Sequence, residues 1–410
     1  MLLFKMAFRN IWRRKFRTII TVFAIGFSYG LLIFFQGLAT GSHEQIANLG
    51  IKLKSGHVVI QEKGYQKEKI LDIRITNPSP IIKKIKEKYP NSVILSRIFT
   101  TGSLRSDSGN IILNNLIAIS PKQEKKISDL PKKIIKGAFF SLKQQAKEII
   151  IGQKAASILN VSIGDKVVLS VSGLEGKTEE LFRIKAIFNM GGDTDLGTAF
   201  IPLTTAQKLL SLGNAVSQIA IFTDNIEDSP KIASVLRSTF ANKHVEVLNW
   251  QESLPTLYQL LWLDSVSMYI FLIIIFGIVA AGILNAVLMS VMERTKELGI
   301  LKSIGMKPHI IFSSIITEAF IMGILSVITG LILGLPLYFY VHKYGLDPTI
   351  FTGKDGFNAA GVNFAENMYA KLHYATIIWT ALIIIVLTLI SSVYPAIRAA
   401  KISPIKALRN

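Results

Sequence analysis

Few residues of this chain have the types and spacing that enzymatic or metal chemistry requires. Gly173–Thr178 has the glycines, lysine and threonine of a phosphate-binding loop, but only two residues separate its glycines where that loop needs four. We therefore expect a hairpin turn there. Gly191–Asp195 places two carboxylates in a turn, too few for a calcium loop, and the six histidines are scattered without a pair at metal-ligand spacing. We expect no enzyme, metal or cofactor in this chain, although a catalytic triad assembled in space stays open.

A charged segment, Glu293–Met306, lies between two long apolar runs. Leu298, Leu301 and Ile304 recur in it at helical spacing, and Gly305 followed by Pro308 gives a stop signal. Its charged residues are Glu293, Arg294, Lys296, Glu297 and Lys302. A short helix between two membrane spans is suited to binding a soluble partner. An ordinary solvated loop is the alternative, and the spacing alone does not decide between the two.

The composition is that of a membrane protein with basic flanks. Half of the 410 residues are apolar, the net charge is +19 and there is no cysteine. The absence of cysteine excludes disulfides and thiolate metal sites. Nucleic-acid binding is the rival explanation of the charge.

Four apolar segments are long enough to cross a hydrocarbon core, which takes about 20 residues. We expect the spans at 18–40, 265–292, 311–341 and 374–397. Residues 1–17 carry six Lys or Arg and no acid, which indicates a cytosolic amphipathic helix that leads into the first span. A cleaved signal peptide is the alternative, but the apolar run is too long for one. The helix of the second span is expected to start near 255 as a rigid stalk.

Some polar and small residues lie inside these spans. Gly26-x-x-x-Gly30 and Gly330-x-x-x-Gly334 place small residues one turn apart. The spacing of the first pair fits two explanations equally well: close approach of a neighbouring helix, or local packing only. Glu318 lies near the cytosolic end of its span, where a basic partner is within reach, so we favour a structural role for it.

The long polar region 41–264 is predicted to be one extracytoplasmic α+β domain of two subdomains, with their boundary near 121–136. Strands are expected at 56–61, 91–105, 110–120, 149–152, 166–171, 181–188, 198–201, 218–222 and 244–248. Helices are expected at 78–88, 153–159, 205–211 and 229–240. A shorter extracytoplasmic loop is expected at 342–373.

The distribution of charge predicts the orientation. The N-terminus, the loop at 293–309 and the tail at 398–410 hold 14 Lys or Arg against two acids, Glu293 and Glu297. Positive charge accumulates on the cytosolic side of membrane proteins, so both termini are expected in the cytosol. This placement explains the charge without nucleic acid.

The residue string Glu293–Gly305, Glu-Arg-x-Lys-Glu-Leu-Gly-Ile-Leu-Lys-x-Ile-Gly, closely resembles the coupling-helix motif of ABC permeases of the MacB/FtsX superfamily. Asn285–Glu297 and Tyr394–Leu408 look like the second-span exit and the C-terminal signature of that family. Ser55–Ile60 and Ala199–Leu203 resemble pieces of the external domain in its lipoprotein-releasing, Lol-type (LolC/LolE) branch, as does the strand at 149–152.

The resemblance implies a MacB-like periplasmic core domain and a complex of two permeases, the second being the same or a paralogous chain. Two separate ABC ATPase subunits would hold the ATP and magnesium, while this chain itself is not an enzyme and binds no cofactor. The residues implied in docking the ATPase are Glu293, Arg294, Lys296, Glu297, Leu298, Gly299, Leu301 and Gly305.

A Lol-type permease of the inner membrane would hold the acyl chains of a lipoprotein between its first two spans and release them to a periplasmic chaperone. Bulky residues that either line this cavity or face membrane lipid are Phe23, Phe27, Phe34, Met268 and Phe271. Two alternatives stay open. One is a MacB-like efflux permease for haem, peptides or drugs, and the other is an FtsX-like scaffold that activates a cell-wall hydrolase.

Overall fold

The computed structural model describes residues 9, 12, 15–140, 147–191, 194–241, 243–347, 357–359, 362–364 and 367–403. The amphipathic helix expected over 1–17 lies mostly outside these residues, as does part of the tail. The chain divides into two compact units. The membrane unit comprises Met1–Glu44, Trp262–Leu346 and Asn367–Asn410, and the sheet unit comprises Gln45–Leu261 and Asp347–Glu366.

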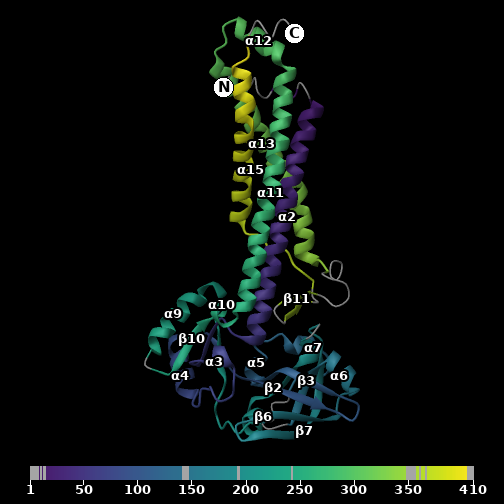
Figure 1. Ribbon diagram of the computed structural model, residues 1–410, viewed down its shortest axis with the longest axis vertical. Helices are drawn as coiled ribbons and strands as arrows, with labels where there is room; N and C mark the ends of the chain where they lie inside the picture. Colours follow the sequence, from purple (N-terminus) through teal and green to yellow (C-terminus); the bar gives the residue numbers. More distant parts are fainter. Residues whose placement is uncertain are drawn as a thin grey trace. The chain divides into compact units, whose positions relative to one another are not determined.

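Four long helices dominate the membrane unit (Figure 1): α2 (Lys15–Lys54), α11 (Pro255–Glu293), α13 (Pro308–Tyr344) and α15 (Tyr374–Ala400). Each is long and apolar enough to cross a membrane. The chain is thus an α-helical membrane protein with four spans and a large α+β domain, as the sequence predicted. As expected, α11 begins at Pro255, and α2 likewise continues well beyond the length that a span needs.

Helices α2 and α13 approach each other through glycines. A Cβ added to Gly30 would lie 2.9 Å from the carbonyl oxygen of Gly330, and one added to Gly330 would lie 2.5 Å from that of Gly26. Gly334 in turn faces the backbone of Gly30. The close approach that the Gly26-x-x-x-Gly30 spacing allowed is therefore present, and its partner is the second glycine pair.

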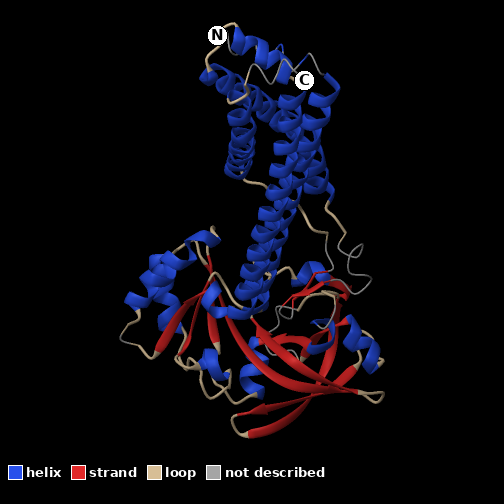
Figure 2. Ribbon diagram, turned by 45° about the horizontal axis from the view of Figure 1, so that its top comes forward, coloured by secondary structure: helices blue, strands red, loops and turns tan. Residues whose placement is uncertain are grey.

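The sheet unit is built on a ten-stranded sheet (Figure 2). Its strands are β1 (Val58–Glu62), β2 (Val93–Arg105), β3 (Asn110–Ile119), β4 (Ile134–Gly137), β5 (Glu148–Gly152), β6 (Lys166–Gly173), β7 (Gly176–Phe188), β8 (Thr198–Pro202), β9 (Gln218–Phe222) and β10 (Val245–Asn249). Their order is β10-β1-β9-β2-β3-β8-β5-β7-β4, and β6 pairs with β2 and β7. The sequence predicted all of these strands except β4, which lies at the end of the interval 121–136.

Short helices connect the strands. They are α3 (Tyr65–Glu68), α4 (Ser79–Lys88), α5 (Pro121–Glu124), α6 (Gln153–Leu159), α7 (Thr194–Gly197), α8 (Leu203–Leu209), α9 (Ser229–Thr239) and α10 (Trp250–Ser253), with 3₁₀ turns η1 (Leu130–Lys133) and η2 (Ile226–Asp228). The longest of these, α4, α6, α8 and α9, are the four predicted helices. A separate hairpin joins β11 (Phe357–Ala359) and β12 (Val362–Phe364).

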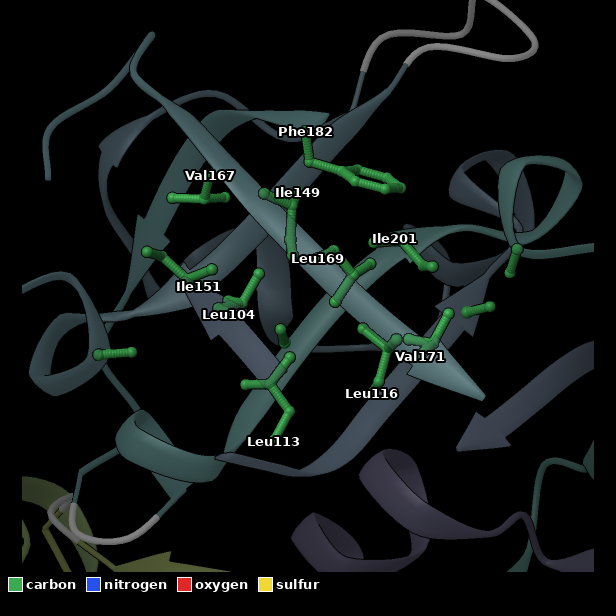
Figure 3. Packing of buried hydrophobic residues seen from close by; sticks show 14 of the residues in the cluster. Leu104, Leu113, Leu116, Ile149, Ile151, Val167, Leu169, Val171, Phe182 and Ile201 are labelled. Carbon is green, nitrogen blue, oxygen red and sulfur yellow. The ribbon is translucent and has the colours of Figure 1, made fainter. Parts of the chain in front are cut away.

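Two large buried clusters stabilise the sheet unit. One draws residues such as Leu104, Ile149 and Phe182 from β2, β5 and β7 (Figure 3), and it spans residues 98–215. The other, formed by β1, β9 and β10 with α4 and α9, uses residues 58–94 and 216–247. Along the chain, the residues of the second cluster therefore lie on both sides of those of the first. The reason is that β2 pairs with β9 along its first half and with β3 and β6 along its second half, so both clusters share this strand.

The segments that imitated catalytic motifs have structural roles. Gly173 pairs with Gly176 at the turn between β6 and β7, which confirms the predicted hairpin. Asp195 is buried and accepts a hydrogen bond from the backbone N–H of Met190 at 2.7 Å. Burial raises the pKa of the Asp195 carboxyl above its usual range. No group of three potential metal ligands exists among the residues that the structure describes.

Candidate coupling site

The charged segment forms a short helix, α12 (Thr295–Ser303), between α11 and α13. Helix α11 ends at Glu293, and the hydroxyl of Thr295 donates to the carbonyl of Met292 at 2.7 Å. Gly305 follows α12 with a φ of 101°, a left-handed conformation that favours glycine, and Pro308 then starts α13. The predicted stop signal therefore acts as expected.

The inner face of α12 is held to the helix bundle. Leu298 is 8% exposed and belongs to the same buried cluster as Val291, Ile311 and Ala399. The ammonium group of Lys302 donates to the carbonyl oxygens of Ala400 at 2.9 Å and Ile402 at 2.8 Å, so it caps the end of α15. Leu298, implied above in docking a partner, instead anchors α12 to its own chain, and Gly299 is buried beside it.

Two ion pairs connect the segment around α12 to other spans. Arg17, in the first turn of α2, donates both terminal nitrogens to the two carboxylate oxygens of Glu293, one of them at 2.7 Å. Arg294 donates to Glu318 of α13 at 3.2 Å and lies 3.6 Å from Glu297. Glu318 thus has the basic partner that the sequence predicted, and Glu293 is engaged within the chain.

A small cavity of about 50 Å³, with a mixed polar and apolar lining, lies beside these ion pairs. It is lined by residues of α2, α11, α12 and α13: Arg17, Thr18, Thr21, Ala286, Val287, Ser290, Val291, Arg294, Leu298, Ile311, Ser314, Ile315, Glu318 and Met322. Such a volume has room for a few water molecules, and the hydroxyls and charges can hydrogen-bond them. The contacts between α12 and the spans therefore enclose a cavity that could hold water.

The outer face of α12 is apolar but exposed. Ile300 is 45% exposed and Ile304, which follows the helix by one residue, is 79% exposed. Lys296 is exposed one turn before Ile300, so the three residues lie on one side of the helix. We call Lys296, Ile300 and Ile304 the outer face of α12. Sequence reasoning missed Ile300, although its position about 200° around the helix from Leu298 separates it from the anchoring side.

The remaining coupling residues fall between these two faces. Leu301 is partly buried, and the side chain of Glu297 is 42% exposed beside Arg294. A carboxylate and a lysine at the start of the helix, together with isoleucines at its end, form a surface suited to a protein partner. Exposed apolar side chains that lie next to one another and are bordered by charges are a marker of such surfaces.

The residues predicted to hold acyl chains lie on α2 and α11. Phe23, Phe27 and Phe271 are each about half exposed, and the rings of Phe23 and Phe27 stack with centroids 6.2 Å apart. Met268 is partly buried. Phe34 packs against the cluster around Tyr338 of α13. The acyl cavity stays a prediction.

Two family models match this chain. The MacB-like periplasmic core domain matches residues 18–239, just over half of the chain, and the FtsX-like permease C-terminal model matches residues 269–404. The chain belongs to the MacB/FtsX superfamily of ABC transporter permeases. It is a multi-pass inner-membrane permease, and α12 lies inside the FtsX-like part.

Curated relatives of this permease include lipoprotein-releasing proteins. The chain is 24% identical to the lipoprotein-releasing system transmembrane protein LolC of Xylella fastidiosa over 71% of each protein. It is 25% identical to LolE of Haemophilus influenzae over 64% of each. The macrolide export ATP-binding/permease protein MacB of Bdellovibrio bacteriovorus is 22% identical, over 98% of this chain and 60% of that protein. Among solved structures, the periplasmic region of MacB from Actinobacillus actinomycetemcomitans matches at 16% identity, with a TM-score of 0.36 over 50% of this chain and 94% of that one.

Proposed function

We propose that this permease extracts acylated lipoproteins from the inner membrane for delivery to the outer membrane, driven by two copies of a separate ABC ATPase. The ATPases dock on the outer face of α12 from the cytosol, where both termini also lie. The observation that carries the docking is the exposure of Ile300 and Ile304 on a short helix that is otherwise anchored to its bundle. Burying one such side chain stabilises a complex by about 1.5–3 kcal/mol before the costs of association.

A displacement of α12 reaches three spans through contacts within the membrane unit. Helices α11 and α13 are its direct neighbours in sequence, and Arg294 ties it to Glu318 of α13. The Arg17–Glu293 pair adds the start of α2. Closure of the ATPases on ATP therefore moves these helices together, and transport needs no channel through the chain.

The substrate class is proposed from the likeness to LolC and LolE together with the exposed rings of Phe23, Phe27 and Phe271. Apolar side chains on two neighbouring spans are suited to acyl chains in a lipid environment. Closure of the spans, within a complex with a second permease, expels the lipoprotein toward a periplasmic chaperone.

Reconstitution tests the proposal. The permease, purified with its native partners, is placed in proteoliposomes with a fluorescent triacylated lipoprotein, and release into the soluble fraction is followed with ATP, without ATP and with a non-hydrolysable analogue. We expect release only with hydrolysable ATP, and the same protein without acyl chains serves as the control. Release that is independent of ATP would refute the proposal.

A MacB-like efflux permease is the second candidate, favoured by the relative MacB, whose match extends over 98% of this chain. In the same proteoliposomes, ATP-dependent transport of haem, a peptide or a macrolide without lipoprotein release would support it. An FtsX-like scaffold is the third candidate. It would bind a cell-wall hydrolase and release neither substrate.

A further inference from the structure

The C-terminal end of α2 is held by one buried arginine of the sheet. Arg97 lies on β2 and is 0% exposed. Its guanidinium group donates to the carbonyl oxygens of Lys52 at 2.6 Å, Leu53 at 3.3 Å and Ser55 at 3.2 Å. The last carbonyls of a helix have no partner within the helix, so Arg97 satisfies groups that burial would otherwise leave unpaired.

The charge of Arg97 is neutralised by Glu124 of α5. The Nε atom donates to one carboxylate oxygen at 3.2 Å and Nη2 to the other at 2.5 Å. Glu124 is itself 3% exposed. With these two bonds, all five N–H donors of Arg97 are in use, three on the end of α2 and two on Glu124. A lysine has neither the number of donors nor the planar geometry to replace this arrangement.

Further contacts immobilise the same turn. Gln218 of β9 donates to the carbonyl oxygen of Lys54 at 3.2 Å, and the Lys52 ammonium lies 2.7 Å from Asp129. Ser55 hydrogen-bonds Ser253 at 2.8 Å. The residues that join α2 to the sheet are thus fixed by side chains from β2, β9 and the segments after α5 and β10.

We propose that Arg97 is the positioning residue of a rigid joint, through which a displacement of α2 is passed to the sheet instead of being absorbed at the helix end. Helix α2 is continuous from Lys15 to Lys54, so the joint is at the end of an unbroken helix whose first turn pairs with Glu293. This inference rests on the proposed ATP-driven movement. The joint itself does not depend on which substrate is moved.

The test uses the full complex and two variants, of which one removes both charges of the pair and the other keeps a positive charge at position 97. Arg97→Met with Glu124→Leu removes both charges, which avoids an uncompensated buried ion. Arg97→Lys keeps a cation beside Glu124 but cannot serve all the acceptors. Lys185→Gln with Glu148→Gln is the matched control, because it removes a partly buried pair that joins β7 and β5 rather than α2 and the sheet.

Two measurements are made on each variant. Hydrogen exchange reports the order of residues 48–56, and spin labels report the nucleotide-dependent distance change between cysteines placed at the exposed positions Tyr374 and Ile112. The natural chain has no cysteine, so only the introduced ones are labelled. We expect at least tenfold faster exchange in both Arg97 variants, loss of the distance change and unchanged ATPase activity, with the control pair behaving like wild type.

The outcomes separate the joint from the function on which it rests. Unchanged exchange at residues 48–56 overturns the role of Arg97 at the helix end. Faster exchange with a normal distance change overturns the joint, since Arg97 would then be only structural. If the wild type itself shows no nucleotide-dependent change, the ATP-driven mechanism fails, and with it the transmitting role of Arg97. If the wild-type complex shows the normal distance change but releases no lipoprotein, only the proposed substrate is rejected, and the joint stands.

Discussion

Ile304 exposes most of its side chain at the end of α12, and it is therefore the residue whose polar replacement should affect partner binding most directly. We expect Ile304→Asp to weaken binding of the ATPase at least tenfold, or about 1.4 kcal/mol, because a central apolar contact is lost. Titration of the ATPase onto the immobilised, detergent-solubilised permease measures this. Unchanged affinity would contradict docking on the outer face.

Leu298→Ala provides the contrasting control, because Leu298 points into the bundle. Its replacement should reduce the stability of the membrane unit by about 2–5 kcal/mol, through lost packing and a cavity, with little direct effect on ATPase affinity. Thermal unfolding of the purified variant distinguishes these effects.

Glu293 was interpreted from the sequence as a contact with the ATPase, whereas the structure pairs it with Arg17. We expect Glu293→Lys to uncouple transport from ATP hydrolysis by separating α2 from α11, because two like charges then face each other. The swap Arg17→Glu with Glu293→Lys should restore coupling. The ratio of lipoprotein released to ATP hydrolysed measures this, and a swap as defective as the single variant would place Glu293 at the partner instead.

His57 gives the sheet unit a dependence on pH. Burial, and secondarily Lys52, lowers the pKa of His57, whose Nδ1 accepts a hydrogen bond from the backbone N–H of Thr223 at 3.2 Å. The folded state binds this proton less tightly than the unfolded chain does. The contribution of neutral His57 to the stability of the sheet unit is therefore fully present above the unfolded-state pKa of about 6.5, and it is lost as the pH drops below that value. Hydrogen exchange at β1 and β9 between pH 7.5 and 5 should show this loss, and His57→Gln should reduce it; an identical pH profile in the variant would exclude His57 as the cause.

Among single residues, the sequence identified the charged ones but not their partners. The charges around Arg294 can be read directly from the sequence. A basic partner for Glu318 was predicted because Glu318 lies near the cytosolic end of its span. That Arg17, 276 positions away, would engage Glu293 depends on helix rotation, which one sequence does not specify. Arg97 gave no signal at all, because a lone arginine in a strand normally faces water.

At the scale of elements, the glycines between α2 and α13 make a sharp comparison possible. We expect Gly330→Ala to destabilise the membrane unit by about 1–3 kcal/mol, since the added carbon would lie 2.5 Å from the backbone oxygen of Gly26. Gly277→Ala in α11 meets no atom within 4 Å, so it should be neutral or stabilising by up to about 1 kcal/mol. Unfolding by steric trapping in bicelles measures both, and equal effects would rule out the close contact as the source.

The helices and strands were largely predictable because their signals are local. Spans follow from apolar length, and the strands of the sheet unit follow from runs of β-branched residues between turn signals. Strand β4 was missed because Ile134–Gly137 is short and follows a Lys- and Pro-rich stretch. The division of the core was also not predictable, because it depends on β2 pairing with β9 and β6, which are far away in the sequence.

For the whole molecule, the orientation in the membrane is the prediction that connects the charge pattern to the proposed mechanism. Since the chain contains no cysteine, one can be introduced at a time. A cysteine at position 112 on β3 should react with a membrane-impermeant maleimide in intact spheroplasts, whereas one at position 304 should react only after permeabilisation. The reverse pattern would place α12 outside and remove the basis for its docking to an ATPase.

The superfamily could be inferred from the sequence because its motifs are long, while the substrate could not. The sequence around exposed aromatic residues such as Phe23 and Phe271 looks the same whether their rings contact acyl chains, a second permease or bulk lipid.

The Arg97–Glu124 pair has a consequence for how this protein can evolve. Loss of either member alone leaves an unpaired charge buried in the protein, so selection should remove single replacements at these two positions. Lineages that abandon the pair should do so by changing both positions, with a new source of donors for the end of α2. In a deep collection of relatives, positions 97 and 124 should therefore substitute in concert.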